Sequence, residues 1–325
     1  MHRRRAISTL AIAAGALVLP VSVRAQRQAL RRVGFIGSGQ TQIFFAAFRS
    51  GLADLGYVEG RDVLYHSRLG GGSSDQLAEF AEALVRERPD IIVAQGGPAL
   101  HAVRKVAGDL PIVFGYSGDP VAAGLVKSFA EPGSNLTGIS FMSLELVGKR
   151  MELLKEAIPG LKSVAILANP EHPGEQNERR VSQSTASALN LQHAYFQAQS
   201  AAELEQAMAA IAKTGVEALM VFPDAVTIAH RKRIAEEAAK ARLPAVSGWG
   251  EFAESGFLMS YGPNLRESYR RLAVFADKVL KGARPARLPI ELPRVVEMVV
   301  NTGTAKTLGI QLPRSVLLRA DRVIE

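Results

Sequence analysis

The sequence predicts an α/β protein made of two doubly wound parallel-sheet domains. Short apolar runs rich in β-branched residues alternate with stretches whose apolar residues recur every three or four positions. This alternation is typical of parallel strands joined by crossover helices. The run at 91–94 is apolar without interruption, as expected for a strand buried on both faces. A chain of 325 residues is also long enough for two domains.

The first half of the chain is predicted to supply one sheet. Its strands are expected, in chain order, at Val33–Gly37, Asp62–Arg68, Ile91–Ala94, Pro111–Phe114 and Leu136–Phe141. Between the first two strands, residues 43–55 carry an apolar stripe at helical spacing. Ser73 and Gln76 have the spacing of a capping box, which predicts a helix from there to Arg88.

A second series of the same design follows. Apolar residues at three- and four-residue spacing predict an amphipathic helix over 144–158. Further strands are expected at Ser163–Ala168, Gln192–Phe196, Ala218–Phe222, Pro244–Ser247 and Phe257–Tyr261. Ser200 and Glu203 form another capping box, and Asn264 is predicted to cap a helix that reaches Val279. The end of the chain, from Val295 onward, predicts one strand and short helical pieces.

Residues 1–25 have the pattern of a cleavable secretory signal peptide. Arg3, Arg4 and Arg5 form a positive start, the stretch 10–19 is almost entirely apolar but short for a membrane span, and Ala25 suits a cleavage site. The mature chain is therefore expected to begin near Gln26 and to reside in a periplasm. The adjacent arginines leave both general secretion and twin-arginine export open.

Cysteine content and charge narrow the class of protein further. The chain has no cysteine, so neither disulfides nor a lipid-modified cysteine anchor is expected. The formal charge is +8, of which the predicted leader contributes four arginines and no acid. The remaining basic residues are interspersed with acids, a pattern that favours solvated helix faces over a nucleic-acid-binding patch. No second run approaches transmembrane length, so no stable membrane insertion is expected after cleavage.

The sequence contains no complete motif for catalysis, nucleotide binding or metal binding. Gly37-Ser38-Gly39 follows the first strand, but Gln42 stands where a dinucleotide fingerprint needs a small residue. Walker, HExxH and GxSxG sequences are absent. The mature histidines lack metal-ligand spacing; they are His66, His101, His172, His193 and His230. We therefore expect no catalytic residues, no cofactor and no metal, although these patterns do not exclude an enzyme.

Candidate ligand-binding residues lie at the predicted strand ends. Open α/β sheets bind ligands outside the carboxyl ends of their strands, where loops and helix N-termini converge. The residues selected on this rule are Ser38, Gln40, Gly96, Gly97, Tyr116, Ser117, Gly118, Asp119, Asn169, Asp224 and Trp249.

Several of these residues also have a purely structural interpretation. Gly96-Gly97 before Pro98 allows a close backbone approach to a ligand, or simply a tight strand-to-helix turn. Asp119, which precedes Pro120, is favoured as a helix N-cap, and Asp224 can be a cap only. Trp249, the sole tryptophan, can stack on a ligand or pack between domains.

A zwitterionic ligand would divide these candidates by charge. Its carboxylate suits backbone N–H groups at helix starts, such as those after Gly96-Gly97 and Ser117-Gly118. Its ammonium group needs an anion in a desolvated cleft, and Asp224 is the candidate for that role. Asp119 is expected chiefly to cap its helix.

Six sequence blocks together resemble one family, the ABC transporter substrate-binding proteins that include tryptophan- and tyrosine-binding members. The blocks are GLADLGYVEGRDV at 51–63, PIVF at 111–114, GDPV at 118–121, PGSNLTG at 132–138, LMSYGPN at 258–264, and Asn301 with TAKTLG at 304–309. The resemblance extends over essentially the whole mature chain. The resemblance implies a type I periplasmic-binding-protein fold of the Venus-flytrap kind, whose chain crosses three times between domains.

The resemblance also implies domain limits, partners and a function. Hinges are expected near Phe141, Gly262 and Ile290, giving an N-terminal domain of 26–141 plus 263–290 and a C-terminal domain of 142–262 plus 291–325. The expected function is capture of a small polar molecule, an aromatic amino acid being one candidate, for an ABC permease and its ATPase. A monomer is expected. Ligand sensing for a membrane receptor, or an enzyme using the same cleft, are the alternatives.

Overall fold

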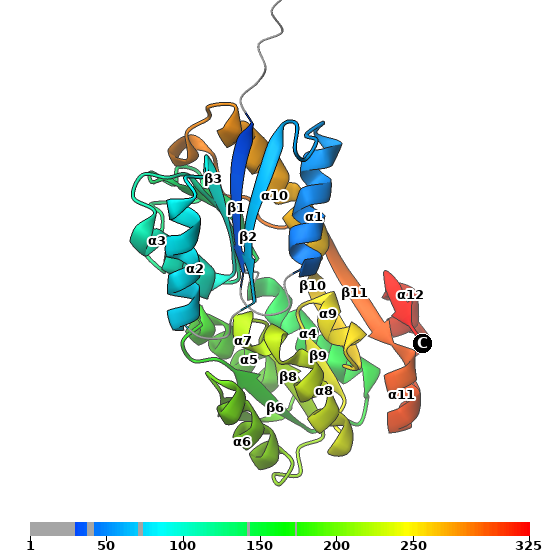
Figure 1. The fold of residues 1–325 in the computed structure, drawn as a ribbon. Coiled ribbons are helices and arrows are strands. Elements are labelled where there is room, and N and C mark those ends of the chain that lie inside the picture. The colour runs from blue at the N-terminus through cyan, green and yellow to red at the C-terminus, as the bar shows by residue number, and fades with distance from the viewer. Residues whose placement is uncertain (1–29, 38–41, 71–73, 142–143, 173) are drawn as a thin grey trace, which may run out of the picture.

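The computed structural model describes residues 30–37, 42–70, 74–141, 144–172 and 174–325. The chain forms two lobes, each with one sheet between helices (Figure 1). The predicted α/β class is therefore confirmed. Ser38, Gln40 and Ser73 lie outside the described residues, as does the predicted leader.

The first lobe holds a five-stranded, fully parallel sheet in the order β2-β1-β3-β4-β5. Its strands are β1 (Arg31–Gly37), β2 (Val63–Leu69), β3 (Ile91–Gln95), β4 (Ile112–Tyr116) and β5 (Leu136–Ser140). Its helices are α1 (Gln42–Asp54), α2 (Ser74–Arg86), α3 (Gly97–Val106) and α10 (Leu265–Leu280). Helices α1 and α10 pack together, as do α2 and α3.

Side-chain alternation along β3 shows why this sheet is covered on both faces. Ile91 and Val93 pack in the same cluster as apolar residues of α1 and α10. Ile92 and Ala94 pack instead in the cluster that contains residues of α2 and α3. All four side chains are fully buried, because successive residues of a strand point to opposite faces.

The second lobe holds a seven-stranded sheet in the order β12-β11-β10-β9-β8-β6-β7. Its strands are β6 (Ser163–Ala168), β7 (Gln192–Gln197), β8 (Ala218–Val221), β9 (Ala245–Ser247), β10 (Met259–Pro263), β11 (Val296–Asn301) and β12 (Arg322–Ile324). Its helices are α4 (Leu144–Ala157), α5 (Glu175–Ala188), α6 (Ala201–Ile211), α7 (Ala225–Ala229), α8 (Arg231–Lys240), α9 (Gly250–Glu254), α11 (Thr302–Leu308) and α12 (Arg314–Arg319). A 3₁₀ turn, η1 (Pro285–Arg287), precedes the return of the chain to this sheet.

The second sheet departs from the sequence prediction at its far edge. Strand β11 runs antiparallel to β10, so the sheet is mixed rather than purely parallel. Strand β12, which pairs parallel to β11, is absent from the strands predicted above. It is only three residues long and shows no alternating run, so the sequence offers little signal for it.

The predicted helix after Asp119 is wrong, because residues 120–124 form turns. Asp119 nevertheless acts as a local cap: its Oδ1 accepts hydrogen bonds from the backbone N–H of Val121 at 2.8 Å and of Ala122 at 3.1 Å. Gly124 then takes a left-handed conformation, with φ +64°, which ends the helical turn.

The chain passes between the two sheets three times. It leaves the first sheet after β5, returns between β10 and α10, and crosses again before β11. At the second passage Gly262 lies so close to Gly248 that an added Cβ would be 1.9 Å from its carbonyl oxygen, so only glycine fits. The domain limits given above stay a prediction.

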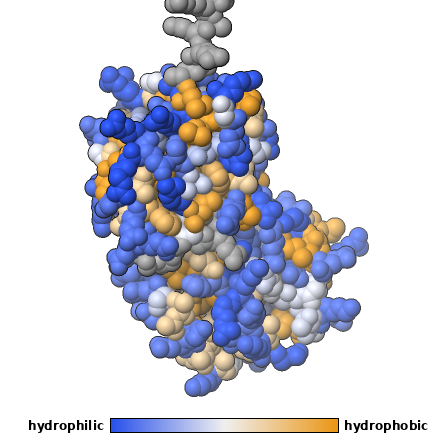
Figure 2. All heavy atoms as spheres, in the orientation of Figure 1, coloured by the Kyte–Doolittle hydropathy of each residue, from blue (hydrophilic) through white to orange (hydrophobic). Residues whose placement is uncertain are grey.

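The surface seen in Figure 2 is mainly hydrophilic, and its hydrophobic residues lie in separate groups. Within the described ranges, no helix is both long enough and apolar enough to span a bilayer.

Candidate functional site

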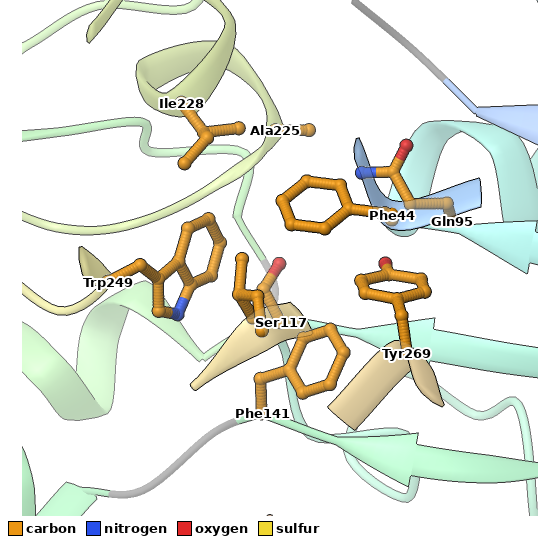
Figure 3. Close-up of a pocket in the computed structure, with 10 residues that line it drawn as sticks. Phe44, Gln95, Ser117, Phe141, Ala225, Ile228, Trp249 and Tyr269 are labelled. Carbon is orange, nitrogen blue, oxygen red and sulfur yellow. The ribbon is translucent and has the colours of Figure 1, made fainter. Parts of the chain in front are cut away.

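A small cavity of about 20 Å³ lies between the two lobes. Its lining comes from both: Phe44, Gln95, Gly96, Ser117, Phe141, Leu265 and Tyr269 from the first, and Ala225, Ile228 and Trp249 from the second (Figure 3). This volume holds about one water molecule and is far below the range of about 300–1,000 Å³ for small-molecule sites, so a ligand enters only if the lobes move apart. The lining is mostly apolar and aromatic, so the opened cavity suits a small aromatic or aliphatic group.

Aromatic rings form the wall on the first lobe. Phe44 of α1 stacks on Tyr269 of α10, with ring centroids 4.8 Å apart. Phe141, which directly follows β5, lies 5.6 Å from the same tyrosine ring. The rings can approach the sheet because Gly115 has no side chain: a Cβ there would lie 2.8 Å from both Phe141 and the Tyr269 hydroxyl.

Gln95, the last residue of β3, places an amide in this wall beside Phe44 and Tyr269 (Figure 3). The Gln95 side chain hydrogen-bonds to the Tyr269 hydroxyl. Burial nevertheless raises the pKa of that hydroxyl well above its ordinary value, so Tyr269 is neutral. The wall therefore contains an amide and a phenol but no charge among these residues.

The second lobe presents helix α7 and Trp249 to the cavity. Asp224 caps α7 with a complete capping box: its Oδ1 accepts from the Thr227 N–H at 2.7 Å, and the Thr227 hydroxyl accepts from the Asp224 N–H at 2.9 Å. The other carboxylate oxygen accepts from the Asn169 side-chain amide at 2.7 Å. Asp224 and Asn169, both predicted site residues, are thus brought together at neighbouring strand ends.

A hydrogen bond joins the lobes beside the cavity. His172, in the loop after β6, lies with Nε2 3.0 Å from the Ser117 hydroxyl of the first lobe. Burial lowers the pKa of His172, although Asp224 and Glu175 oppose that shift. A mainly neutral imidazole therefore bridges the two strand-end loops.

Behind His172 lies a cluster of buried charged residues. Burial raises the pKa of Glu178 to about 8, and the nearby Arg150 guanidinium opposes the shift. Burial lowers the pKa of Arg150 to about 10, and its Nε donates to the Tyr261 carbonyl at 2.8 Å. Gly248 leaves room for this guanidinium, since a Cβ there would lie 2.6 Å from Nη2. Within the described part of the chain, no group of His, Asp and Glu side chains could hold a metal ion.

The predicted candidates fall into three groups. Gly96, Ser117 and Trp249 line the cavity, whereas Gly97, Tyr116, Gly118, Asp119, Asn169 and Asp224 do not line it. Tyr116 is instead fully buried in the core of the first lobe, beneath Gly97. Gly118 accepts a hydrogen bond from the Ser140 hydroxyl through its carbonyl oxygen. Ser38 and Gln40 lie outside the described residues.

Apart from Trp249, the sequence does not reveal the aromatic lining, because the rings of the first lobe also satisfy a core pattern. Phe44 and Tyr269 belong to the apolar stripes of α1 and α10, and each is almost completely buried. Phe141 is predicted only as the end of a strand. Gln95 does give a signal, since it is a polar residue at the carboxyl end of an otherwise apolar strand.

Comparison with known proteins fits this two-lobed arrangement. The model of the ABC transporter substrate-binding protein family matches residues 39–324. This chain belongs to that family. The resemblance predicted from the sequence blocks is therefore confirmed.

Individual relatives agree with the family. The chain is 24% identical over 265 residues to a tyrosine-binding protein of Clostridioides difficile, covering 81% of this chain and 76% of the relative. A conserved domain protein of Vibrio cholerae has 26% identity and a TM-score of 0.83, over 90% of this chain and 99% of that one. An ABC domain from Streptococcus pneumonia in complex with L-Trp has 24% identity and the same TM-score, over 91% and 100%. The type I periplasmic-binding-protein fold of this family member is thereby confirmed, and its family function is that of a substrate-binding protein of an ABC transporter.

Proposed function

We propose that this substrate-binding protein captures an aromatic amino acid between its lobes and delivers it to an ABC permease driven by an ATPase. The observation that carries the proposal is the aromatic-lined cavity between the lobes, next to which lie the polar side chains of Asp224, Asn169 and His172. Relatives named for tyrosine binding and for an L-Trp complex support the same ligand class. The proposal assigns no catalytic residue.

The polar ends of such a ligand are proposed to lie at the strand-end loops. The Asp224 carboxylate accepts one hydrogen bond at each oxygen and has lone pairs left for an ammonium group. The carboxylate of the ligand is proposed to bind backbone N–H groups at the helix start after Gly96-Gly97 and at Ser117-Gly118. The Gly96 N–H itself is already used, because it donates to the Gly115 carbonyl at 2.8 Å, so the N–H groups of α3 proper are the better candidates.

Binding can be tested even while the ligand is unidentified. Mass spectrometry of the denatured protein should identify any co-purified compound, and calorimetry against all common amino acids should give the tightest binding with an aromatic one. Small-angle scattering should show a smaller radius of gyration with ligand, since a solute that touches both lobes favours the closed form. Tightest binding of a sugar or an aliphatic amino acid would contradict the proposed ligand class.

Delivery to a permease requires export, and the proposed location is the periplasm. The predicted leader with its positive start and apolar stretch supports this location. N-terminal sequencing of the exported protein should begin at or near Gln26. Recovery of the protein only in the cytoplasm, with Met1 retained, would contradict export.

A further inference from the structure

The Gln95 amide in the cavity wall carries an oxygen that no described group satisfies. Gln95 is 5% exposed, and its Oε1 is sealed from solvent and has no hydrogen-bond partner among the described residues. Buried polar atoms of native proteins nearly always have a partner, so an unsatisfied acceptor at a ligand cavity points to a group that arrives with the ligand. Gln95 is one of the residues that line this cavity.

The opposite half of the amide is already engaged. Because Oε1 has no partner, the side-chain hydrogen bond between Gln95 and Tyr269 is made by the amide nitrogen, which donates to the phenol oxygen. Tyr269 is in turn held between Phe44 and Phe141, at 4.8 and 5.6 Å between ring centroids. A fixed tyrosine therefore occupies the amide N–H group and leaves the amide oxygen as the free acceptor.

Ser117 and Trp249 line the same cavity and carry donors, but neither bonds to this oxygen. Phe44, Phe141 and Leu265 offer no hydrogen-bond donor from their side chains. A bound ring without a donor would leave Oε1 unsatisfied, because this atom is sealed from solvent. A ring that carries an N–H or O–H group could donate a hydrogen bond to it.

From this arrangement we propose that Gln95 selects aromatic ligands that carry a hydrogen-bond donor on the ring, an indole N–H or a phenol O–H, over plain phenyl or aliphatic side chains. The inference rests on the proposed function and narrows its ligand class. Sites built to hydrogen-bond a ligand N–H or O–H reject analogues that lack it, because the protein group is then left unpaired. Tryptophan and tyrosine meet the requirement, whereas phenylalanine does not.

The test compares pairs of ligands that differ in the donor alone. L-tryptophan is paired with β-(3-benzothienyl)-L-alanine, in which sulfur replaces the indole N–H, and L-tyrosine with L-phenylalanine. In calorimetry the wild-type protein should prefer the donor-bearing member of at least one pair by roughly tenfold or more, the size of one buried hydrogen bond. In Gln95→Leu, which removes the acceptor and keeps an apolar side chain of similar length, both ratios should fall to about twofold or less.

Two further variants keep the test decisive. Gln95→Glu retains an acceptor and should retain the preference, so it serves if the leucine variant does not fold. Gln192→Leu makes the same change at an exposed position of β7 and should alter neither ratio.

The outcomes separate this inference from the proposed function. Equal binding of both members of each pair by the wild-type protein would overturn the selection by Gln95 but leave aromatic capture intact. A preference that survives in folded Gln95→Leu would overturn it as well. Failure to bind any aromatic amino acid would overturn the proposed ligand class, and the inference with it.

Discussion

The two sides of the cavity differ in what they can offer a ligand. The first lobe contributes stacked rings on helices α1 and α10, together with the Gln95 amide and the hydroxyls of Tyr269 and Ser117. The second lobe adds Trp249 and the apolar face of α7, and next to them lie Asp224, Asn169 and His172. One side therefore provides apolar contact and the other provides most of the charge.

The difference follows from what each side does for its own lobe. Tyr269 and Phe44 belong to the main apolar core, so the aromatic wall is also a structural element. The polar side instead consists of strand ends and helix caps, where backbone N–H groups and carboxylates meet. A ligand with an apolar ring and charged ends would match both sides at once, and four substitutions test that division.

Among the substitutions, Tyr269→Ala should have the largest effect, and that effect should be on the stability of the fold. Tyr269 is 1% exposed and packs against Phe44 and Phe141, so its removal leaves a cavity in the core of the first lobe. We expect a loss of about 3–5 kcal/mol in the free energy of unfolding. Chemical denaturation measures it, with Tyr269→Phe as the control that keeps the ring. A loss below about 1 kcal/mol would show that the aromatic wall is separate from the core.

Asp224→Asn should act on binding more than on stability. The amide can still accept from the Thr227 N–H, but it removes the charge and places a donor toward the Asn169 amide. Loss of a charge-assisted bond to a ligand ammonium should weaken L-tryptophan binding by about 1.5–3 kcal/mol, roughly tenfold to 150-fold. Indole-3-propionate, which lacks the ammonium group, should bind both proteins alike.

A control separates the charge of Asp224 from its capping role. Thr227→Val breaks the hydroxyl side of the capping box and leaves the carboxylate in place. It should lower stability with a much smaller effect on L-tryptophan affinity. Unchanged affinity in Asp224→Asn would remove Asp224 from the site and weaken the case for a zwitterionic ligand.

The sequence indicates the polar strand ends near the cavity more clearly than the aromatic wall of the first lobe, for a physical reason. Asn169 and Asp224 beside the cavity, and Ser117 in its lining, stand out because a polar residue after an apolar strand must lie at the carboxyl edge of the sheet. Phe44 and Tyr269 do not stand out, since an apolar residue on a helical stripe has the same pattern whether it faces the core or a cavity. These two residues do both.

The strands and helices could be predicted from apolar periodicity. The features that were not predicted depend on contacts between distant segments or on a single residue. The run at 91–94 is buried on both faces as predicted, because continuous apolarity along a strand leaves no face for solvent. The order of the strands and the antiparallel β11 depend on contacts between distant segments. The turn after Asp119 is instead decided locally. The cap at Asp119 alone predicts a helix, and the left-handed glycine at 124 ends it after one turn.

A pH series tests the buried charges behind the polar side. Burial raises the pKa of Glu178 to about 8, well above the ordinary value of 4.5, so the folded protein holds a proton that the unfolded chain releases between these values. Stability from this group is therefore present at low pH and is lost as pH rises toward 8. Relative to Glu178→Gln, the wild-type protein should lose up to about 1.4 kcal/mol per pH unit between about pH 6.5 and 8.

The chosen pH range keeps other groups out of the comparison. His172, whose pKa is lowered from 6.5, stays neutral there, and Glu251, with a pKa raised to about 7, is common to both proteins. Thermal or denaturant unfolding at several pH values gives the two curves. Parallel curves would show that Glu178 is already ionised in the folded state, with Arg150 as its counter-charge.

Asp119→Ala should have the smallest effect, because this carboxylate caps its own turn and lies away from the cavity lining. Its Oδ1 accepts from the N–H groups of Val121 and Ala122, and the residue does not line the cavity. Loss of the cap should lower the free energy of unfolding by about 1 kcal/mol, as at helix caps. Asp119→Asn keeps a capping oxygen and should recover most of that loss. Affinity for L-tryptophan, measured by calorimetry in both variants, should stay within about twofold of wild type. A large loss of affinity in the alanine variant, with stability unchanged, would instead place Asp119 among the ligand contacts and give the first lobe a charge of its own.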